Sequence, residues 1–150
     1  MNVKGGPCPS EGTVRLFREI ATTFDAKNNL LEEVTAFIGK AYVSDEVELF
    51  RVRLSIDEGL QNAFSHGNGE DPGKHIRLAI FDTDASWGVL ITDEGPGFQP
   101  QNLPDPTSPD GLWLDHGRGV MIMCHYMDGV SYFDQGRTLR LLKGKGKKEA

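Results

Sequence analysis

The chain has 150 residues, of which 38% are hydrophobic and 25% charged, a composition that favours one globular domain over a disordered chain. Its 22 acidic and 16 basic residues leave a net charge of −6, which argues against non-specific binding to nucleic acid or to an anionic membrane. Cys8 and Cys124 form no C-x-x-C pair, and no apolar run approaches the roughly 20 residues of a membrane span. We therefore expect a cytoplasmic protein without a disulfide framework or a zinc site.

The two ends of the chain differ in composition from the middle. Residues 1–12 contain three glycines and two prolines and are expected to form a flexible leader, while residues 143–150 are expected to form a basic flexible tail. Between them, residues 13–142 contain no internal repeat and no long linker, so we predict a single domain there.

The first half of that domain is predicted to hold one strand and two helices. Residues 13–20 alternate as a strand does, and Asp25 is placed to cap a helix that reaches about Ile38, with Gly39 as its stop. Ser44 is placed to cap a longer helix that ends at the glycines after residue 66. The apolar stripe of this second helix consists of Leu49, Val52, Ile56, Leu60 and Ala63.

The second half is predicted to be mainly sheet. Residues 75–81 and 86–92 form a hairpin, and residues 130–133 and 138–142 form another after a short helix over 118–127. Between the hairpins, the proline-rich residues 96–109 are expected to be a functional or mobile loop. This order suggests a mixed, mainly antiparallel sheet with helices on one face. Trp87 and Cys124 are expected in the core.

The first candidate motif lies on the longer helix, where Glu58 and Asn62 are four residues apart and share a face. A carboxylate there can act as a general base, and an amide oxygen can complete a magnesium shell together with phosphate oxygens and water. Gly59 between them costs about 1 kcal/mol relative to alanine, which a close approach of backbone or ligand would explain. The alternative is a solvated polar face.

The second candidate motif, Asp-Glu-Gly-Pro-Gly at residues 93–97, directly follows a predicted strand. Asp93 can accept a hydrogen bond from an amino group such as that of adenine, and Gly95 and Gly97 let a flat ring approach the backbone. The alternative is a turn rich in glycine and proline.

The third candidate motif, Gly117-Arg118-Gly119, opens the last predicted helix, where free backbone N–H groups can bind phosphate and Arg118 can add positive charge. The alternative is a helix-capping turn. The spacing fits neither a P-loop nor a dinucleotide-binding fingerprint.

Taken together, E-x-x-x-N on a helix, D-x-G-x-G after a strand and G-x-G opening a helix resemble the ATP site of the GHKL superfamily. Within this superfamily, the chain resembles the anti-sigma-factor serine kinases. Asn62 is followed directly by Ala63 and, four residues after Asn62, by His66, and Met127-Asp128 follows the hydrophobic helix. The resemblance covers about residues 13–142.

This resemblance implies a Bergerat-type ATP-binding fold, an α+β two-layer sandwich that binds ATP and Mg²⁺. Asn62 would hold the metal, Glu58 would be the catalytic base, and the other nucleotide-binding residues would be Asp93, Gly95, Gly97, Gly117, Arg118 and Gly119. The implied activity is phosphorylation of a serine on an anti-anti-sigma (STAS-type) protein, together with binding and inhibition of a sigma factor, by a homodimer.

One departure keeps other functions open. Some of these kinases carry a basic residue just before the glycine of the third motif, where this chain has Asp115-His116. An ATP-responsive protein-binding switch with little or no kinase activity is therefore the main alternative. A histidine-kinase catalytic domain is disfavoured, because the G-x-G is single and no phosphoacceptor helix precedes the domain.

Overall fold

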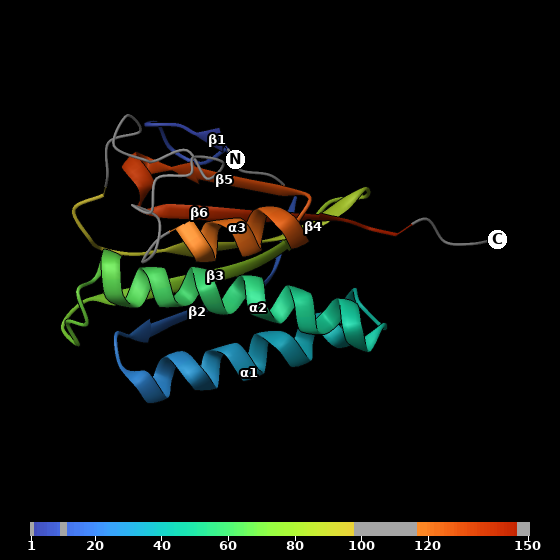
Figure 1. Ribbon diagram of the computed structural model, residues 1–150, viewed down its shortest axis with the longest axis horizontal. Helices are drawn as coiled ribbons and strands as arrows, with labels where there is room; N and C mark the ends of the chain where they lie inside the picture. Colours follow the sequence, from blue (N-terminus) through green and yellow to red (C-terminus); the bar gives the residue numbers. More distant parts are fainter. Residues whose placement is uncertain (1, 10–11, 98–116, 147–150) are drawn as a thin grey trace.

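A computed structural model describes residues 2–9, 12–97 and 117–146 of the protein. The proline-rich loop, including Asp115 and His116, lies outside these residues. Six strands and three α-helices follow one another along the described chain (Figure 1). In order they are β1 (Asn2–Val3), β2 (Thr13–Ala21), α1 (Phe24–Ala41), α2 (Glu46–Asn62), β3 (His75–Asp82), β4 (Ser86–Thr92), α3 (Gly117–Tyr126), β5 (Gly129–Phe133) and β6 (Thr138–Gly144).

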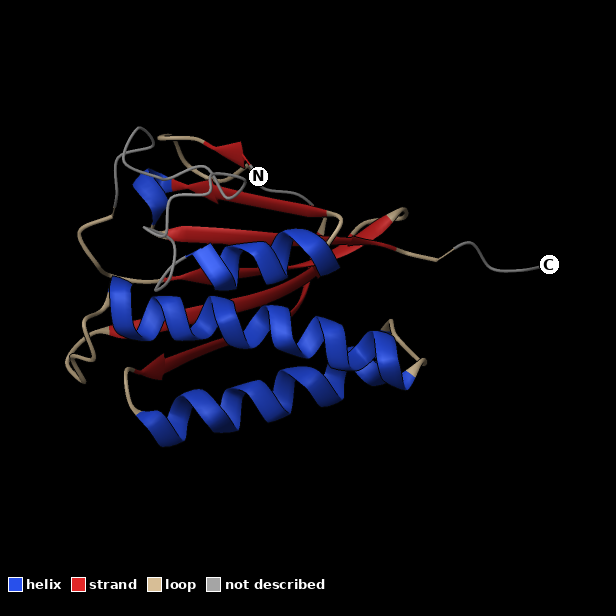
Figure 2. Cartoon of the chain, viewed as in Figure 1, coloured by secondary structure: helices blue, strands red, loops and turns tan. Residues whose placement is uncertain are grey.

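The strands form one sheet in the order β1-β5-β6-β4-β3-β2. Only β1 and β5 pair in parallel, and every other neighbouring pair is antiparallel. The three α-helices cover one face of the sheet, so the molecule has two layers (Figure 2). The predicted α+β sandwich with a mixed, mainly antiparallel sheet is confirmed.

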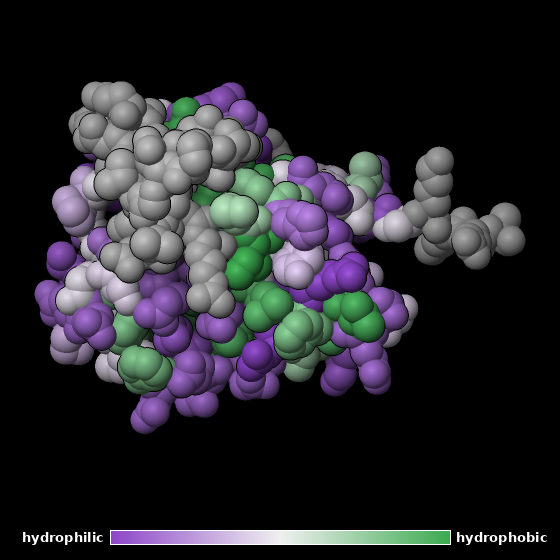
Figure 3. Space-filling view, viewed as in Figure 1, coloured by the Kyte–Doolittle hydropathy of each residue, from purple (hydrophilic) through white to green (hydrophobic). Residues whose placement is uncertain are grey.

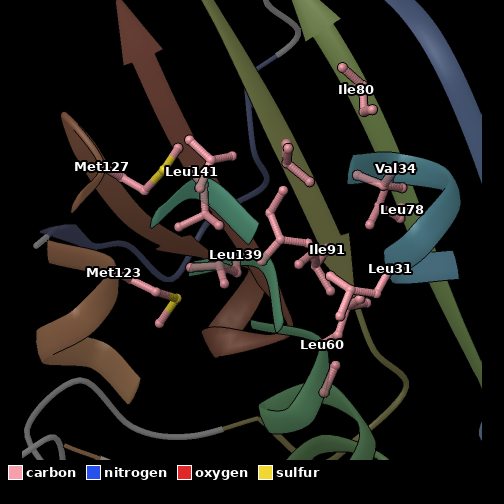
Figure 4. Close-up of a cluster of buried hydrophobic side chains, with 14 of the residues drawn as sticks. Leu31, Val34, Leu60, Leu78, Ile80, Ile91, Met123, Met127, Leu139 and Leu141 are labelled. Carbon is pink, nitrogen blue, oxygen red and sulfur yellow. The ribbon is translucent and has the colours of Figure 1, made fainter. Parts of the chain in front are cut away.

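The hydrophobic core lies between the helices and the sheet. Alternate residues of the central strands point into it, and the apolar stripes of α1, α2 and α3 meet them (Figure 4). Side chains with no exposed surface include Val34, Ile38, Ile56, Leu60, Ile76, Leu78, Ile80, Val89, Met123 and Leu141. Trp87 is 1% exposed, as predicted from its place in the strand alternation.

The ends of the first two helices differ from the sequence prediction by a few residues. α1 starts after Thr23, whose hydroxyl accepts a hydrogen bond from Ala26 N–H, and it continues through Gly39 to Ala41. Gly39 lies inside the helix and does not end it. An ideal Cβ on Gly39 would come within 3.0 Å of the Leu49 side chain, so the close contact between α1 and α2 explains a glycine at this position. α2 is capped by Asp45 rather than Ser44, since the Asp45 carboxylate accepts from Glu48 N–H.

The described start of the chain pairs with the sheet, and Cys124 departs from expectation. Asn2 and Val3 pair with β5, and the Lys4 N–H donates to the Tyr132 carbonyl, because the outer edge of β5 offers unpaired backbone groups. Cys124 is exposed rather than buried, because its neighbour Met123 takes the core-facing position of α3. No helix in the described segments is both long and apolar enough to cross a membrane.

Candidate functional site

The first and third sequence motifs meet where α2 runs beside α3. An ideal Cβ on Gly119 would lie 2.6 Å from Glu58 Oε2, so the carboxylate rests against the backbone of the first turn of α3. At the other end of the two helices, the guanidinium of Arg51 on α2 lies over the ring of Tyr126 on α3. Because the earlier residue of α2 meets the later residue of α3, the two helices run antiparallel. A residue larger than glycine at position 119 would displace the Glu58 carboxylate.

Gly59 explains how α2 comes so close to the sheet. A Cβ at this position would lie 2.9 Å from Ile91 Cδ1 and from Leu139 Cδ2. The glycine therefore lets the helix backbone settle onto β4 and β6, which is the close approach that the sequence suggested. It brings α2 close to β4, the strand that the second motif directly follows.

Asn62 is oriented by a tyrosine that the sequence did not single out. Its side chain hydrogen-bonds with the Tyr132 hydroxyl on β5. Burial raises the pKa of Tyr132, and the bond from Asn62 opposes that rise. Asn62 therefore lies within reach of Tyr132, and its side chain carries the kind of amide oxygen that can complete a magnesium shell.

The first and second motifs meet just beyond Asn62. There the α-helix widens into a π-helical turn, η1 (Ala63–Gly67), of the kind often found at functional sites. A Cβ on Gly67 would overlap the carboxylate of Asp93, so Asp93 packs directly against the end of this turn. Residues that are 26 positions apart in the chain, Asn68 and Glu94, are joined here by a hydrogen bond.

Asp93 begins a short segment, residues 93–97, which we call the Asp93 loop. Asp93 Oδ1 accepts from Gly95 N–H at 2.8 Å, and within the described part of the chain no hydrogen bond is made to Oδ2. Burial raises the pKa of Asp93 to about 6, while the Gly95 N–H and the positive charge of Arg137 act in the opposite direction. At neutral pH this is a half-buried anion able to accept a hydrogen bond from a ligand.

Asn68 was not among the predicted site residues, although it lies only six residues after Asn62. Its side chain is 1% exposed, and its amide donates to the Thr22 hydroxyl and to the His75 carbonyl. Its oxygen accepts from Glu94 N–H at 2.7 Å. Asn68 thus ties the end of η1 to the Asp93 loop with all its hydrogen-bonding groups engaged.

We expect Gly95→Ala to disrupt both the fold and the site. A Cβ there would lie 2.6 Å from the carbonyl carbon of Gly67 and closer still to its oxygen, and backbone cannot move aside as a side chain can. The variant should lose about 2 to 3 kcal/mol of unfolding free energy in urea denaturation.

Gly5→Ala is the matched control, because a Cβ at Gly5 meets nothing within 4 Å. It should unfold at the same urea concentration as the wild type. An unchanged midpoint for Gly95→Ala would show that η1 and the Asp93 loop are not in tight contact.

The third motif occupies the first turn of α3, which begins at Gly117 and includes Arg118 and Gly119. Backbone N–H groups at such a helix start have no partner inside the helix and carry the positive end of its dipole. Because Glu58 lies against Gly119, an anion bound by these N–H groups would lie close to the Glu58 carboxylate.

The structure therefore gathers Glu58, Asn62, Asp93 and the start of α3 around one region. The donor set suits a magnesium nucleotide: an acceptor for a base, an amide oxygen for a metal, and backbone N–H groups for phosphates. The described residues hold no group of three or more His, Cys, Asp or Glu side chains able to bind a metal by themselves. Phosphate oxygens of a bound nucleotide are the kind of additional ligand that magnesium takes at such a site.

Comparison with known families agrees with this geometry. A family model described as a histidine kinase-like ATPase domain matches residues 11–143, which is most of the chain. The protein belongs to this family of ATPase domains, and membership of the family implies that it binds ATP.

Two curated relatives are more specific. The chain is 27% identical over 122 residues to the anti-sigma F factor of Geobacillus stearothermophilus, covering 77% of this chain and 82% of the relative. It is 28% identical over 109 residues to the anti-sigma F factor of Geobacillus kaustophilus (strain HTA426), covering 69% and 74%. These matches and the family model confirm the likeness to anti-sigma kinases of the GHKL superfamily.

Proposed function

We propose that the protein is an ATP- and magnesium-dependent serine kinase that phosphorylates an anti-anti-sigma (STAS-type) protein and also binds and inhibits a sigma factor. The convergence of Glu58, Asn62 and Asp93 with the first turn of α3 supports a working nucleotide site. The likeness to two anti-sigma F factors supports the choice of partners. We infer a homodimer from the same likeness.

In this proposal each motif contacts a different part of ATP. The Asp93 carboxylate accepts a hydrogen bond from the adenine amine, while Gly95 and Gly97 leave room for the ring. Gly117, Arg118 and Gly119 bind phosphates at the start of α3. The Asn62 amide oxygen binds magnesium together with phosphate oxygens and water.

Glu58 is the proposed general base. ATP supplies the γ-phosphoryl group, and catalysis of such a transfer depends mainly on positioning and on neutralising charge. The Glu58 carboxylate lies against Gly119, beside the proposed phosphate site, so it can take the proton of a serine hydroxyl as the oxygen attacks phosphorus.

Exposed apolar side chains on the helical face support a protein partner. Figure 3 shows a mostly hydrophilic surface on which apolar residues gather over the helices. On α2 and α3 the large exposed ones are Val47, Phe50 and Met121, each more than half exposed. Apolar groups gathered on a soluble surface mark contact sites for proteins. This feature suits the alternative function, an ATP-responsive protein-binding switch, equally well.

The first test is ATP binding by calorimetry with and without magnesium. We expect the wild type to bind ATP more tightly with magnesium, and Asn62→Ala to weaken magnesium-dependent binding at least about tenfold through loss of a metal ligand. Asn29→Ala, on the exposed side of α1, is the matched control and should bind like the wild type. Absence of ATP binding by the wild type in either condition would overturn the proposed site.

A further inference from the structure

The turn between β5 and β6 has an unusual backbone and contacts the Asp93 loop closely. Asp134 and Gln135, in the short turn η4 (Asp134–Gly136), have φ angles of 52° and 55°, and Gly136 has 85°. Two consecutive non-glycine residues in the left-handed region are costly and persist only where surrounding contacts enforce them. The Gln135 carbonyl lies where a Cβ on Gly97 would be, so the loop backbone packs directly on the turn.

Arg137 follows this turn and makes the polar contacts to the loop. Its Nε donates to the Gly95 carbonyl at 2.7 Å, and its Nη2 donates to the Pro96 carbonyl at 3.0 Å. Its own carbonyl accepts from Asp93 N–H at 2.9 Å, which extends the β4–β6 ladder by one step. One residue therefore binds three of the five residues of the loop, and it binds two of them through the planar fork of its guanidinium.

The rest of the guanidinium is held by the turn itself. Its Nη1 donates to the Asp134 carbonyl and to the Gln135 side-chain oxygen, both at 3.3 Å. On the other side of the turn, Asp134 N–H donates to the Gly6 carbonyl at 2.7 Å. The turn and the arginine thus form one hydrogen-bonded unit, oriented toward the loop that carries Asp93.

We infer that Arg137 is a positioning residue that holds the Asp93 loop in the conformation required for binding the nucleotide base. The inference rests on the proposed function, because it assumes that Asp93 receives adenine. Arg137 binds loop carbonyls and is not itself a ligand of the base. The contacts of the Arg137 guanidinium and of the Gln135 carbonyl with the loop hold the turn in its strained conformation.

The test compares two substitutions of Arg137 by ATP calorimetry in the presence of magnesium. Arg137→Met removes both the fork and the charge, whereas Arg137→Lys keeps the charge but cannot donate to both carbonyls in the same geometry. We expect both variants to bind ATP at least about tenfold more weakly than the wild type. Arg18→Met is the matched control, since Arg18 also joins two elements, β2 and α1, through Glu33.

A pH series separates positioning from a general loss of stability. The charged groups that act on Asp93 are Arg137 and Lys74, which lower its pKa, and Asp134, which raises it. The pH midpoint of ATP binding should therefore rise in Arg137→Met and stay near the wild-type value in Arg137→Lys. Binding is measured below the thermal unfolding temperature of each variant, so that the folded protein is compared.

Three outcomes would count against the inference. Wild-type affinity in Arg137→Met would overturn it while leaving the proposed function intact. Wild-type affinity in Arg137→Lys would also overturn it, because charge alone would then be sufficient. If the wild-type chain bound no ATP, the proposed function would fail and this inference with it.

Discussion

Glu58→Gln is expected to abolish phosphotransfer while leaving ATP binding within about threefold of the wild type. Removal of a positioned general base commonly costs about 100-fold to 10,000-fold in rate. Glutamine keeps the length of the side chain and its packing against Gly119, so the start of α3 should remain in place. The measurement is transfer of labelled γ-phosphate to the STAS-domain proteins encoded in the same genome, together with ATP calorimetry on both proteins.

Asp57→Asn is the matched control, because it neutralises the adjacent carboxylate on the same helix without touching the proposed site. It should transfer phosphate at the wild-type rate. Should the wild type itself bind ATP and a partner yet transfer no phosphate to any STAS-domain protein, the kinase proposal would be replaced by the switch. In that case Glu58→Gln would leave partner binding unchanged.

Asp93→Asn is expected to stabilise the unliganded protein and at the same time to weaken ATP binding. Burial raises the Asp93 pKa from its ordinary value of 3.8 to about 6, so keeping this carboxylate ionised costs folding free energy at neutral pH. Since each pKa unit corresponds to about 1.4 kcal/mol, the variant should gain on the order of 3 kcal/mol. Asparagine can still accept from Gly95 N–H, so the loop should keep its shape.

The sign of the pH dependence follows from the raised pKa. When Asp93 is protonated, the wild type no longer pays the cost of a buried charge. The extra unfolding free energy of the variant should therefore be full above about pH 6 and disappear as the pH falls toward 3.8. Urea denaturation of both proteins over this range measures the difference. ATP binding should fall about 100-fold, because the asparagine N–H₂ would face the adenine amine, donor against donor.

Glu94→Gln is the control for Asp93→Asn. The Glu94 carboxylate accepts from His75 N–H at 2.6 Å, and this bond holds its pKa below the ordinary value. Its neutralisation should therefore not stabilise the protein at neutral pH. A stabilising effect of Glu94→Gln equal to that of Asp93→Asn would show that total charge, rather than burial of Asp93, is responsible.

Periodicity was sufficient to predict most of the fold. The 3.6-residue stripe of α2 and the alternation of β3 and β4 locate these elements because burial on one face leaves a pattern in the chain. Helix ends were less predictable, since Gly39 continues α1 only because Leu49 packs against it, a contact between two helices. β1 was missed because two residues carry no pattern, and their pairing depends on the exposed edge of β5.

The motifs predicted a set of residues for the nucleotide site, but not the residues that support them. Glu58, Asn62, Asp93 and Gly119 do converge, although their chemical roles remain predictions. Tyr132 and Arg137 could not be found from the sequence, because no local pattern relates them to Asn62 and Gly95. Arg137 lies 42 residues from Gly95, and only the register of β6 on β4 brings them together.

That register also has a consequence for protein synthesis. Glu58, Asn62 and Asp93 lie before α3 in the chain, whereas Gly119, Tyr132 and Arg137 lie in α3 or after it and are made later. Synthesis runs from the N-terminus, so a nascent chain holds an incomplete site until Arg137 has left the ribosome and β6 has paired with β4. Truncated translation products would lack these supports and could not compete with the finished protein for nucleotide.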